Sequence, residues 1–155
     1  MVNFSSDTMK SHGSDQLLKE AQVGRLATCS DDQPYIVPIS FVYGDGKIIF
    51  HGARTGKKME NIAANNQVSF EVDESEFIPG DDPCKLHWKF RSVVASGKAK
   101  VLEDPDEIVP ALQLLVEKYS PGLGSLITQK RVDSYANLAL VEITVEEMTE
   151  RVETD

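Results

Sequence analysis

The stretch GRLATCSDDQPYIVPISFVYGDGKIIFH, residues 24–51, decides the fold class. Its apolar and β-branched residues form three runs, at 24–30, 35–43 and 47–51, which are separated by the polar turns DDQP and GDG. Such short turns favour hairpins, whereas parallel strands need a crossover of about a dozen residues or more. The stretch therefore predicts three antiparallel strands that follow one another as a meander.

Helices and further strands follow on both sides of this stretch. Thr55 and Asp104 are expected to cap two of the helices, and Gly97 is expected to mark a bulge or bend. The predicted helices cover 14–22, 55–66, 104–120 and 125–131, and the predicted strands cover 67–73, 85–103 and 137–148, with a polar loop over 74–83. This order is typical of a mainly β (α+β) fold, a closed or half-closed antiparallel barrel with a few flanking helices.

Composition and charge narrow the function. The chain has 155 residues, 41% of them hydrophobic, and a formal net charge of −9. One domain is expected, and binding to nucleic acid or to an anionic membrane is not, because both need a positive surface. No apolar run approaches the ~20 residues that span a bilayer, and the first residues lack the apolar core of a signal peptide, so we expect a cytoplasmic protein.

A small basic cluster follows the third predicted strand. Arg54, Lys57 and Lys58 gather where a helix is expected to begin. Cations are unfavourable at a helix N-terminus unless an anion compensates them, and the free N–H groups there bind phosphate. Gly52 and Gly56 would allow a ligand to approach the backbone closely. A bound phosphate and two solvated lysines are equally compatible with this pattern.

Three other places hold polar residues within apolar runs. His51 ends a strand beside the basic cluster, either as a packing residue or as part of the same pocket. Pro38 cannot donate to a strand ladder, so it lies at an edge, at a bulge or beside a ligand, with Ser40 close by. Arg91 and Ser92 either face solvent or reach a ligand or a partner chain.

Motifs for self-sufficient catalysis are missing from the sequence. There is no Ser/His/Asp elbow, no carboxylate pair in an apolar setting, no Walker A loop and no GxGxxG between a strand and a helix. Cys29 and Cys84 are expected to be free thiols, and the histidines lack the spacing of a zinc site. Any chemistry is therefore expected to come from a bound organic cofactor.

Several segments together carry a resemblance to a known family. They are GRLATCSDDQPYIVPISFVYGDGKIIFHGARTGKKMENIAANNQVSFEVD, then WKFRSVVASGKAKVLEDPDE and ALQLLVEKY, within a region from about Gln16 to about Val145. In this order they resemble the pyridoxamine 5′-phosphate oxidase-like FMN-binding split-barrel superfamily. The branch they resemble most contains the nitroimidazole resistance proteins.

The resemblance implies an antiparallel split β-barrel, to which we assign residues 14–148. The polar residues 1–13 are expected to form a flexible tail, and residues 149–155 a C-terminal tail. It implies a homodimer with two FMN sites at the interface. The residues that it assigns to the flavin ring and ribityl chain are Val37, Pro38, Ile39, Ser40, Phe50 and His51. It assigns the phosphate to Lys57 and Lys58, with Arg54, and it assigns Arg91 and Ser92 to completing the partner's site.

The activity implied by the resemblance is an FMN-dependent oxidoreductase that reduces nitroaromatic small molecules with electrons from NAD(P)H. His51 matches the histidine linked in that branch to cofactor binding and nitro reduction. The Trp- and Arg-bearing final strand of true pyridoxamine phosphate oxidases has no counterpart after VEITVEEMTERV. A non-catalytic flavin-binding or flavin-sensing protein, a B6-phosphate or haem carrier, and a ligand-free dimerisation domain remain as alternatives.

Overall fold

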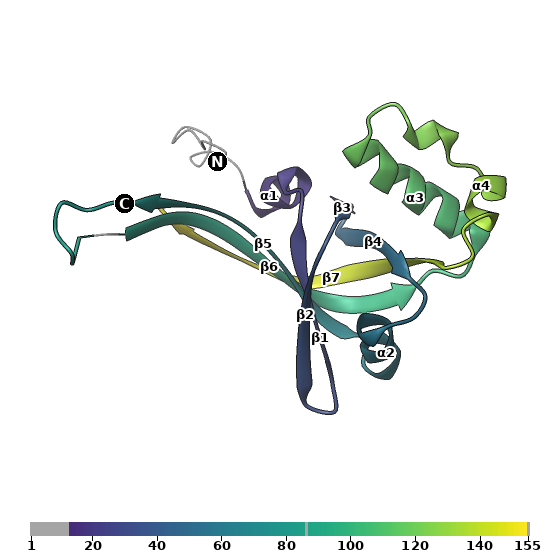
Figure 1. The fold of residues 1–155 in the computed structure, drawn as a ribbon, viewed down its shortest axis with the longest axis horizontal. Helices are drawn as coiled ribbons and strands as arrows, with labels where there is room; N and C mark the ends of the chain where they lie inside the picture. Colours follow the sequence, from purple (N-terminus) through teal and green to yellow (C-terminus); the bar gives the residue numbers. More distant parts are fainter. Residues whose placement is uncertain (1–12, 86, 155) are drawn as a thin grey trace.

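The computed structural model describes residues 13–85 and 87–154. Most of them lie in seven strands and a few short or medium helices (Figure 1). The strands are β1 (Gly24–Ser30), β2 (Gln33–Ile39), β3 (Phe41–Gly44), β4 (Lys47–Ala53), β5 (Gln67–Ile78), β6 (His87–Val101) and β7 (Leu138–Glu153). The helices are α1 (Ser14–Glu20), α2 (Lys57–Ala64), α3 (Pro105–Tyr119), η2 (Gly124–Leu126) and α4 (Gln129–Asp133).

All seven strands belong to one antiparallel sheet, in the order β2-β1-β5-β6-β7-β4-β3. The edge strands β2 and β3 do not pair, yet only Ser40 separates them in the chain. The sheet must therefore curl until its two edges meet end to end, which makes a barrel that is not closed by hydrogen bonds. The mainly β split-barrel fold is confirmed.

The predicted meander over residues 24–51 is wrong at its second strand, which the structure divides into β2 and β3. β1 pairs with β2, and β3 pairs with β4, but β2 and β3 lie at opposite edges of the sheet. The two hairpin turns are as expected, since positive φ angles occur at Asp31 and Asp32 and at Asp45 and Gly46. Such pairs of residues form the tight turns that match the twist of paired strands.

Two apolar clusters hold the fold together. The first fills the barrel and includes Phe41 and Phe70, whose rings meet edge to face with centroids 4.6 Å apart. The second lies outside the barrel, where α3 covers β3, β4 and the beginning of β7. Side chains alternate along β4 and so contribute to both clusters: Ile48 and Phe50 point into the barrel, and Ile49 points to α3.

The expected cap and bulge are both present. Asp104 accepts a hydrogen bond from the N–H of Asp106 at 2.8 Å and caps α3, with Pro105 in its first turn. The pairing of β6 with β7 shifts register between Ser96 and Gly97. A Cβ at Gly97 would lie 2.0 Å from the carbonyl oxygen of Thr144, so only glycine fits this close approach.

Three strands extend beyond the barrel as an arm, made of residues 73–78 of β5, 87–92 of β6 and 148–153 of β7 (Figure 1). Half of the predicted loop over 74–83 and most of the predicted tail over 149–155 are thus strand. These segments are rich in polar residues, but each one pairs across the arm, which the local pattern does not reveal.

The predicted tail over 1–13 lies outside the described residues except for Gly13. Within the part of the chain that the structure describes, no helix is long and apolar enough to cross a membrane.

Candidate functional site

Helix α2 begins with an irregular backbone that only glycine adopts readily. Gly56 has φ 114° and ψ 169°, and it occupies the N-cap position expected for Thr55. Its carbonyl accepts hydrogen bonds from the N–H groups of Met59 and Glu60, both at 3.0 Å. The N–H groups of Lys57 and Lys58 precede the first bond that closes the helix, so they are available to an anion.

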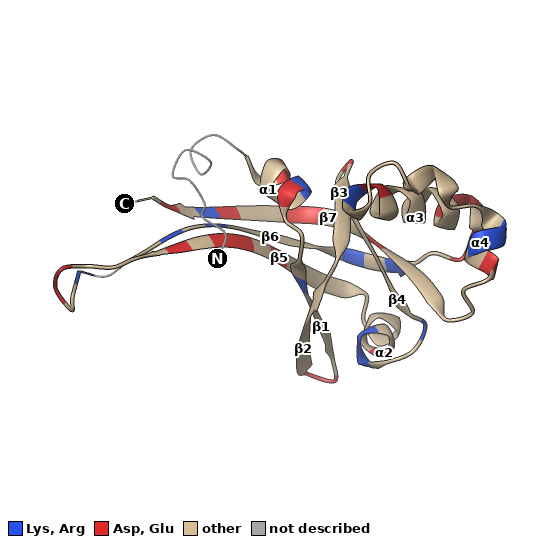
Figure 2. Ribbon diagram, turned by 45° about the horizontal axis from the view of Figure 1, so that its top comes forward, with Lys and Arg blue, Asp and Glu red and all other residues tan. Residues whose placement is uncertain are grey.

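Lys58 folds back over strand β4. Its Nζ lies 5.6 Å from the centroid of the buried Phe50 ring, and 2.9 Å from where a Cβ on Gly52 would stand. Lys58 is half-buried and Lys57 is exposed, and neither takes part in an ion pair among the described residues. Two lysines without an ion pair thus stand at the positive end of α2, where Figure 2 colours the ribbon blue, in a first turn that also carries Glu60. An anion would stabilise this arrangement.

His51 lies directly before Gly52 on the same strand. Partial burial and the neighbouring Lys58 ammonium lower the pKa of His51 below its ordinary value, so its imidazole is neutral at physiological pH. The β3–β4 ladder begins with the Phe41–Phe50 pair, which places Ser40 one step outside it, opposite His51. The fold therefore brings His51 close to Lys58, and Ser40 directly precedes the residue that pairs with Phe50.

The four residues expected along the flavin ring do not share one side of β2. Ile39 is buried and Val37 packs against the barrel core, whereas the side chains of Pro38 and Ser40 are exposed. By alternation, Phe50 likewise points into the barrel. Pro38, Ser40 and His51 are thus the members of the expected ring contact that are open to a ligand.

Helix α3 contributes two residues, Tyr119 and Lys118, that the sequence pattern did not indicate as part of the site. The hydroxyl of Tyr119 accepts the N–H of Phe41 at 2.9 Å and lies 2.7 Å from the carbonyl of Gln22. Lys118 donates to the carbonyl of Ala21 at 2.6 Å, and its Nζ lies 4.0 Å from the Phe41 ring centroid. Together they hold the chain where β2 passes into β3, next to Ser40.

Arg54, Arg91 and Ser92 lie apart from this group. The Arg54 N–H donates to Asn137, and the residue lines a cavity of about 320 Å³ beside α4. Arg91 is 2% exposed and faces Glu74 across the arm, with Nη2 and Oε1 2.9 Å apart. Ser92, its neighbour, points to the opposite side of the sheet and is half-buried.

A second cavity, of about 390 Å³, lies between α3 and the β3–β4 hairpin. A third, of about 370 Å³, lies beside β1 and β5. None of the three is lined by His51, Lys57 or Lys58. The polar group at the start of α2 therefore lies outside these three cavities.

Residues 11–152 match a protein-family model described as pyridoxamine 5′-phosphate oxidase. A relative from Rhizobium meliloti, an uncharacterised protein, is 30% identical over 136 residues, which are 83% of either chain. A second relative, the 5a,11a-dehydrotetracycline/5a,11a-dehydrooxytetracycline reductase of Streptomyces rimosus, is 36% identical over 90 residues, which are 55% of this chain and 58% of the relative.

Solved structures of other proteins have the same fold. An FAD-binding protein of Mesorhizobium loti is 27% identical, with a TM-score of 0.56 over 87% of this chain and 88% of that one. A candidate 5-nitroimidazole antibiotic resistance protein of Bacteroides thetaiotaomicron has a TM-score of 0.74 and 20% identity, over 97% of this chain and 85% of that one. At that identity the likeness shows the fold alone.

Proposed function

The chain belongs to the pyridoxamine 5′-phosphate oxidase family, and on that premise we propose that it binds FMN and reduces conjugated small molecules, nitroaromatic compounds among them, with electrons from NAD(P)H. The observation that carries the proposal is the pair of lysines at the start of α2. Lys58 rests on Gly52 and forms no ion pair with a carboxylate among the described residues, although Glu60 stands in the same helical turn, so a phosphate could bind there.

The terminal phosphate of FMN matches this site better than the bridging diphosphate of FAD. A terminal phosphate carries close to two negative charges at neutral pH, and Lys57 and Lys58 with two free N–H groups would compensate both. Pro38 and Ser40, exposed at the end of β2, would then lie along the ring. His51, neutral and adjacent, would offer a hydrogen bond to the ring or to the substrate.

A bound flavin supplies hydride or electron transfer, and this chain's residues bind and orient it. The oxidoreductase part of the proposal draws support from the Streptomyces relative, a reductase of a conjugated polycyclic compound. Nitroaromatic substrates draw support from the resistance protein of similar fold. Both substrate classes are flat and conjugated, which fits a reaction at an open flavin face.

The absorbance spectrum of the purified protein tests the cofactor directly. We expect an FMN spectrum, or tight uptake of added FMN, and FMN in the mass spectrum of what heat releases. Anaerobic addition of NADH or NADPH should bleach the flavin, and a nitroaromatic compound should restore its colour. FMN that binds but is reduced by neither donor would leave a flavin-binding protein without this activity.

A B6-phosphate carrier is the second candidate, because pyridoxal phosphate offers the same terminal phosphate to Lys57 and Lys58. Its absorbance near the ultraviolet differs from that of a flavin. Competition between the two ligands, followed by flavin fluorescence, ranks them. Pyridoxal phosphate that displaces FMN at equal concentration would favour the second candidate.

A further inference from the structure

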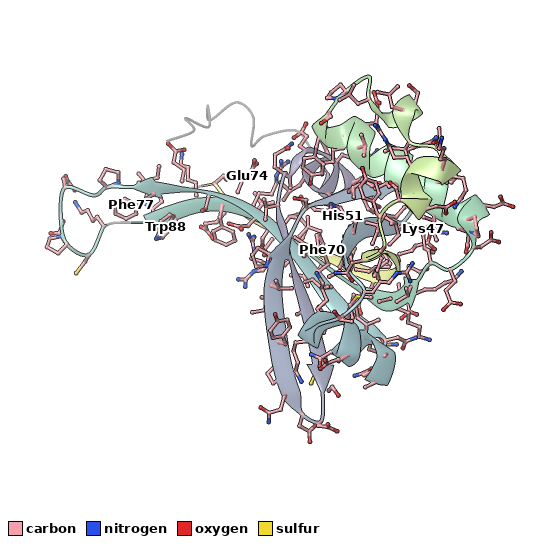
Figure 3. All side chains as sticks on the ribbon, turned by 45° about the vertical axis from the view of Figure 1, so that its right-hand side comes forward. Lys47, His51, Phe70, Glu74, Phe77 and Trp88 are labelled. Atoms are coloured by element: carbon pink, nitrogen blue, oxygen red, sulfur yellow. The ribbon has the colours of Figure 1, made fainter. Side chains whose placement is uncertain are left out.

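The cavity of about 390 Å³ between α3 and the β3–β4 hairpin is lined by none of the residues expected to hold a flavin. Lys47, which lines it, lies on the α3 side of the molecule, whereas Phe77 and Trp88 mark the far end of the arm (Figure 3). A volume of this order is typical of sites for small organic molecules. The cavity therefore offers the chain a second place for a ligand.

The inner walls of the cavity are apolar. Helix α3 presents Pro110 and Leu114, which are four residues apart and so share one face of the helix, with Ala111 between them. Val42 and Ile49, a cross-strand pair of the β3–β4 hairpin, form the opposite wall. Ile49 and Ala111 are buried, and Leu114 is exposed. An apolar group that enters the cavity therefore leaves water and contacts apolar side chains on two sides.

The charged residues that line the cavity are mostly acidic. Three carboxylates line it, those of Asp45 in the hairpin turn, Glu107 on α3 and Glu142 on β7, together with one ammonium, that of Lys47. The hydrogen bond to Glu142, at 2.9 Å, is the main cause that raises the pKa of Lys47. Nearby Glu107 and Asp45 raise that pKa further. The four groups thus lie close enough to act on one another, and their charges sum to −2.

Two of the three carboxylates are open to a further cation. Asp45 forms no ion pair among the residues that the structure describes. Glu107 receives Lys100 at 3.1 Å, but both side chains are well exposed, and a pair of this kind contributes little to stability. Glu142, in contrast, is 16% exposed and already bonded to Lys47. A cation that enters the cavity is therefore expected to lie between Asp45 and Glu107.

These charges favour an organic cation over a metal ion or an anion. In the described part of the chain, no group of three or more histidine, cysteine or carboxylate side chains could hold a metal ion. An anion would be repelled by the charge of the cavity and by the net charge of the chain, −9. Pro110 has no N–H, so the carbonyl of Asp106 receives no helical hydrogen bond and is open to a donor. An alkylammonium group, with three N–H donors, matches these acceptors.

From these observations we propose that the cavity binds a small organic ammonium ion whose aromatic or branched alkyl body lies between α3 and the β3–β4 hairpin. The ammonium group lies between Asp45 and Glu107, and the body contacts Val42, Ile49 and Leu114. Burial of the body supplies affinity, and the carboxylates select for positive charge. The site is independent of the proposed flavin site, so it can be filled with or without FMN.

Three matched probes test the proposal: 2-phenylethylammonium, 2-phenylethanol and phenylacetate share an aromatic ring and differ in charge. Each is titrated into the full-length protein, with and without added FMN, and methyl NMR spectra report the contacts. 2-Phenylethylammonium should bind saturably, with a dissociation constant of roughly 1 mM, and shift the methyl signals of Val42, Ile49 and Leu114. 2-Phenylethanol should bind at least about threefold more weakly, and phenylacetate more weakly still.

Several outcomes of these titrations would overturn the proposal. They are the absence of saturable binding by 2-phenylethylammonium, equal affinity for the three probes, and shifts confined to residues outside the cavity. Displacement of the cation by FMN would do the same, because the cation would then occupy the cofactor site.

Charge variants separate selection for charge from packing. Asp45→Asn combined with Glu107→Gln should weaken binding of the cation about tenfold and leave that of 2-phenylethanol unchanged, since both side chains are exposed and keep their shape. Lys47→Gln removes the one ammonium and should strengthen binding about threefold. Glu103→Gln combined with Asp106→Asn is the matched control, because it removes the same charge beside the start of α3 from side chains that do not line the cavity. Equal losses in the two double variants would contradict a site at the cavity.

Ala111→Leu tests the apolar part of the site. Ala111 is 4% exposed and lines the cavity, so the larger side chain should fill part of it and weaken 2-phenylethylammonium and 2-phenylethanol alike. A urea midpoint close to that of the parent protein shows that the variant is folded. Binding as strong as in the parent protein would place the ligand elsewhere and overturn the proposal. The charge variants decide the outcome if Ala111→Leu does not fold.

Discussion

The hydroxyl of Tyr119, at the end of α3, lies 2.9 Å from the backbone nitrogen of Phe41 and 3.0 Å from its carbonyl oxygen. Phe41 is the first residue of β3, where the chain leaves one edge of the sheet for the other. A side chain 78 positions later thus satisfies the backbone at the one point where the barrel edges meet. Ser40, the adjacent residue, owes its position to this contact.

Tyr119→Phe should loosen that crossing point. The change leaves the N–H of Phe41 without its acceptor, which costs about 1–3 kcal/mol of unfolding free energy. A lower urea midpoint with an unchanged m-value is the expected result. Tyr135→Phe is the control, because Tyr135 is exposed and its hydroxyl has no bonded partner within the described chain. Equal losses for the two variants would contradict a specific role for Tyr119.

Lys58→Gln should weaken FMN binding more than Lys57→Gln does. Lys58 is half-buried over Phe50, where screening by water is weaker than at the exposed Lys57. We expect a loss of about tenfold to a hundredfold in FMN affinity for Lys58→Gln, which corresponds to roughly 1.4–2.8 kcal/mol. Riboflavin, which has no phosphate, should bind both variants as it binds the parent protein.

The same variant should raise the pKa of His51, because the Lys58 ammonium is one of the two causes that lower it. A histidine NMR titration measures this shift, and Lys57→Gln is its control. If FMN and riboflavin lose affinity equally in Lys58→Gln, the lysine does not contact phosphate.

Gly52→Ala should displace the Lys58 side chain. The added Cβ would stand 2.9 Å from Nζ, and the flexible lysine can move away, so the fold should stay within about 0.5 kcal/mol of the parent protein. FMN affinity should fall because the ammonium no longer lies over β4. Gly44→Ala, where the new Cβ meets open space, provides the matched control. Unchanged FMN affinity in Gly52→Ala would remove Gly52 from the site.

Stability should rise with pH because of Lys118. Burial lowers the pKa of Lys118 to about 8 in the folded protein, from its ordinary value of 10.5. Between these two values the unfolded chain binds more protons than the folded one, so the unfolding free energy increases from about pH 8 to about pH 10.5. Denaturant titrations of the parent protein and Lys118→Met across this range should show that rise only in the parent. Parallel curves would contradict the shift.

Local signals in the sequence were sufficient for much of the fold. Residues 24–30 form a strand with the expected bounds, and the Asp45–Gly46 turn and the Asp104 cap depend only on neighbours in the chain. The separation of β2 from β3 depends on β7, which pairs with β4 about 90 residues later and leaves no mark on residues 35–43. The polar ends of β5 and β7 were missed because their partners lie across the arm.

For the candidate site, the basic cluster and His51 were identifiable because they are close in sequence. The side of the sheet to which each side chain points was harder to predict, as Arg91 illustrates. Val93 and Ala95 follow Arg91 at alternate positions of β6, and both are apolar residues that face inward. The alternation of side chains along a strand therefore indicated that Arg91 also points inward. Tyr119 and Lys118 could not be found, since no local pattern links the end of α3 to the crossing at Ser40.

The position of β7 in the middle of the sheet has a consequence for synthesis. This last strand lies between β6 and β4, so neither half of the barrel has its neighbour until residues 138–153 have left the ribosome. At about 5–20 residues per second, β4 waits roughly 5–20 seconds for β7 with one edge unpaired. We therefore expect the sheet to be completed only once β7 has emerged, as one cooperative unit, and a nascent chain stalled before Leu138 to expose unpaired strand edges.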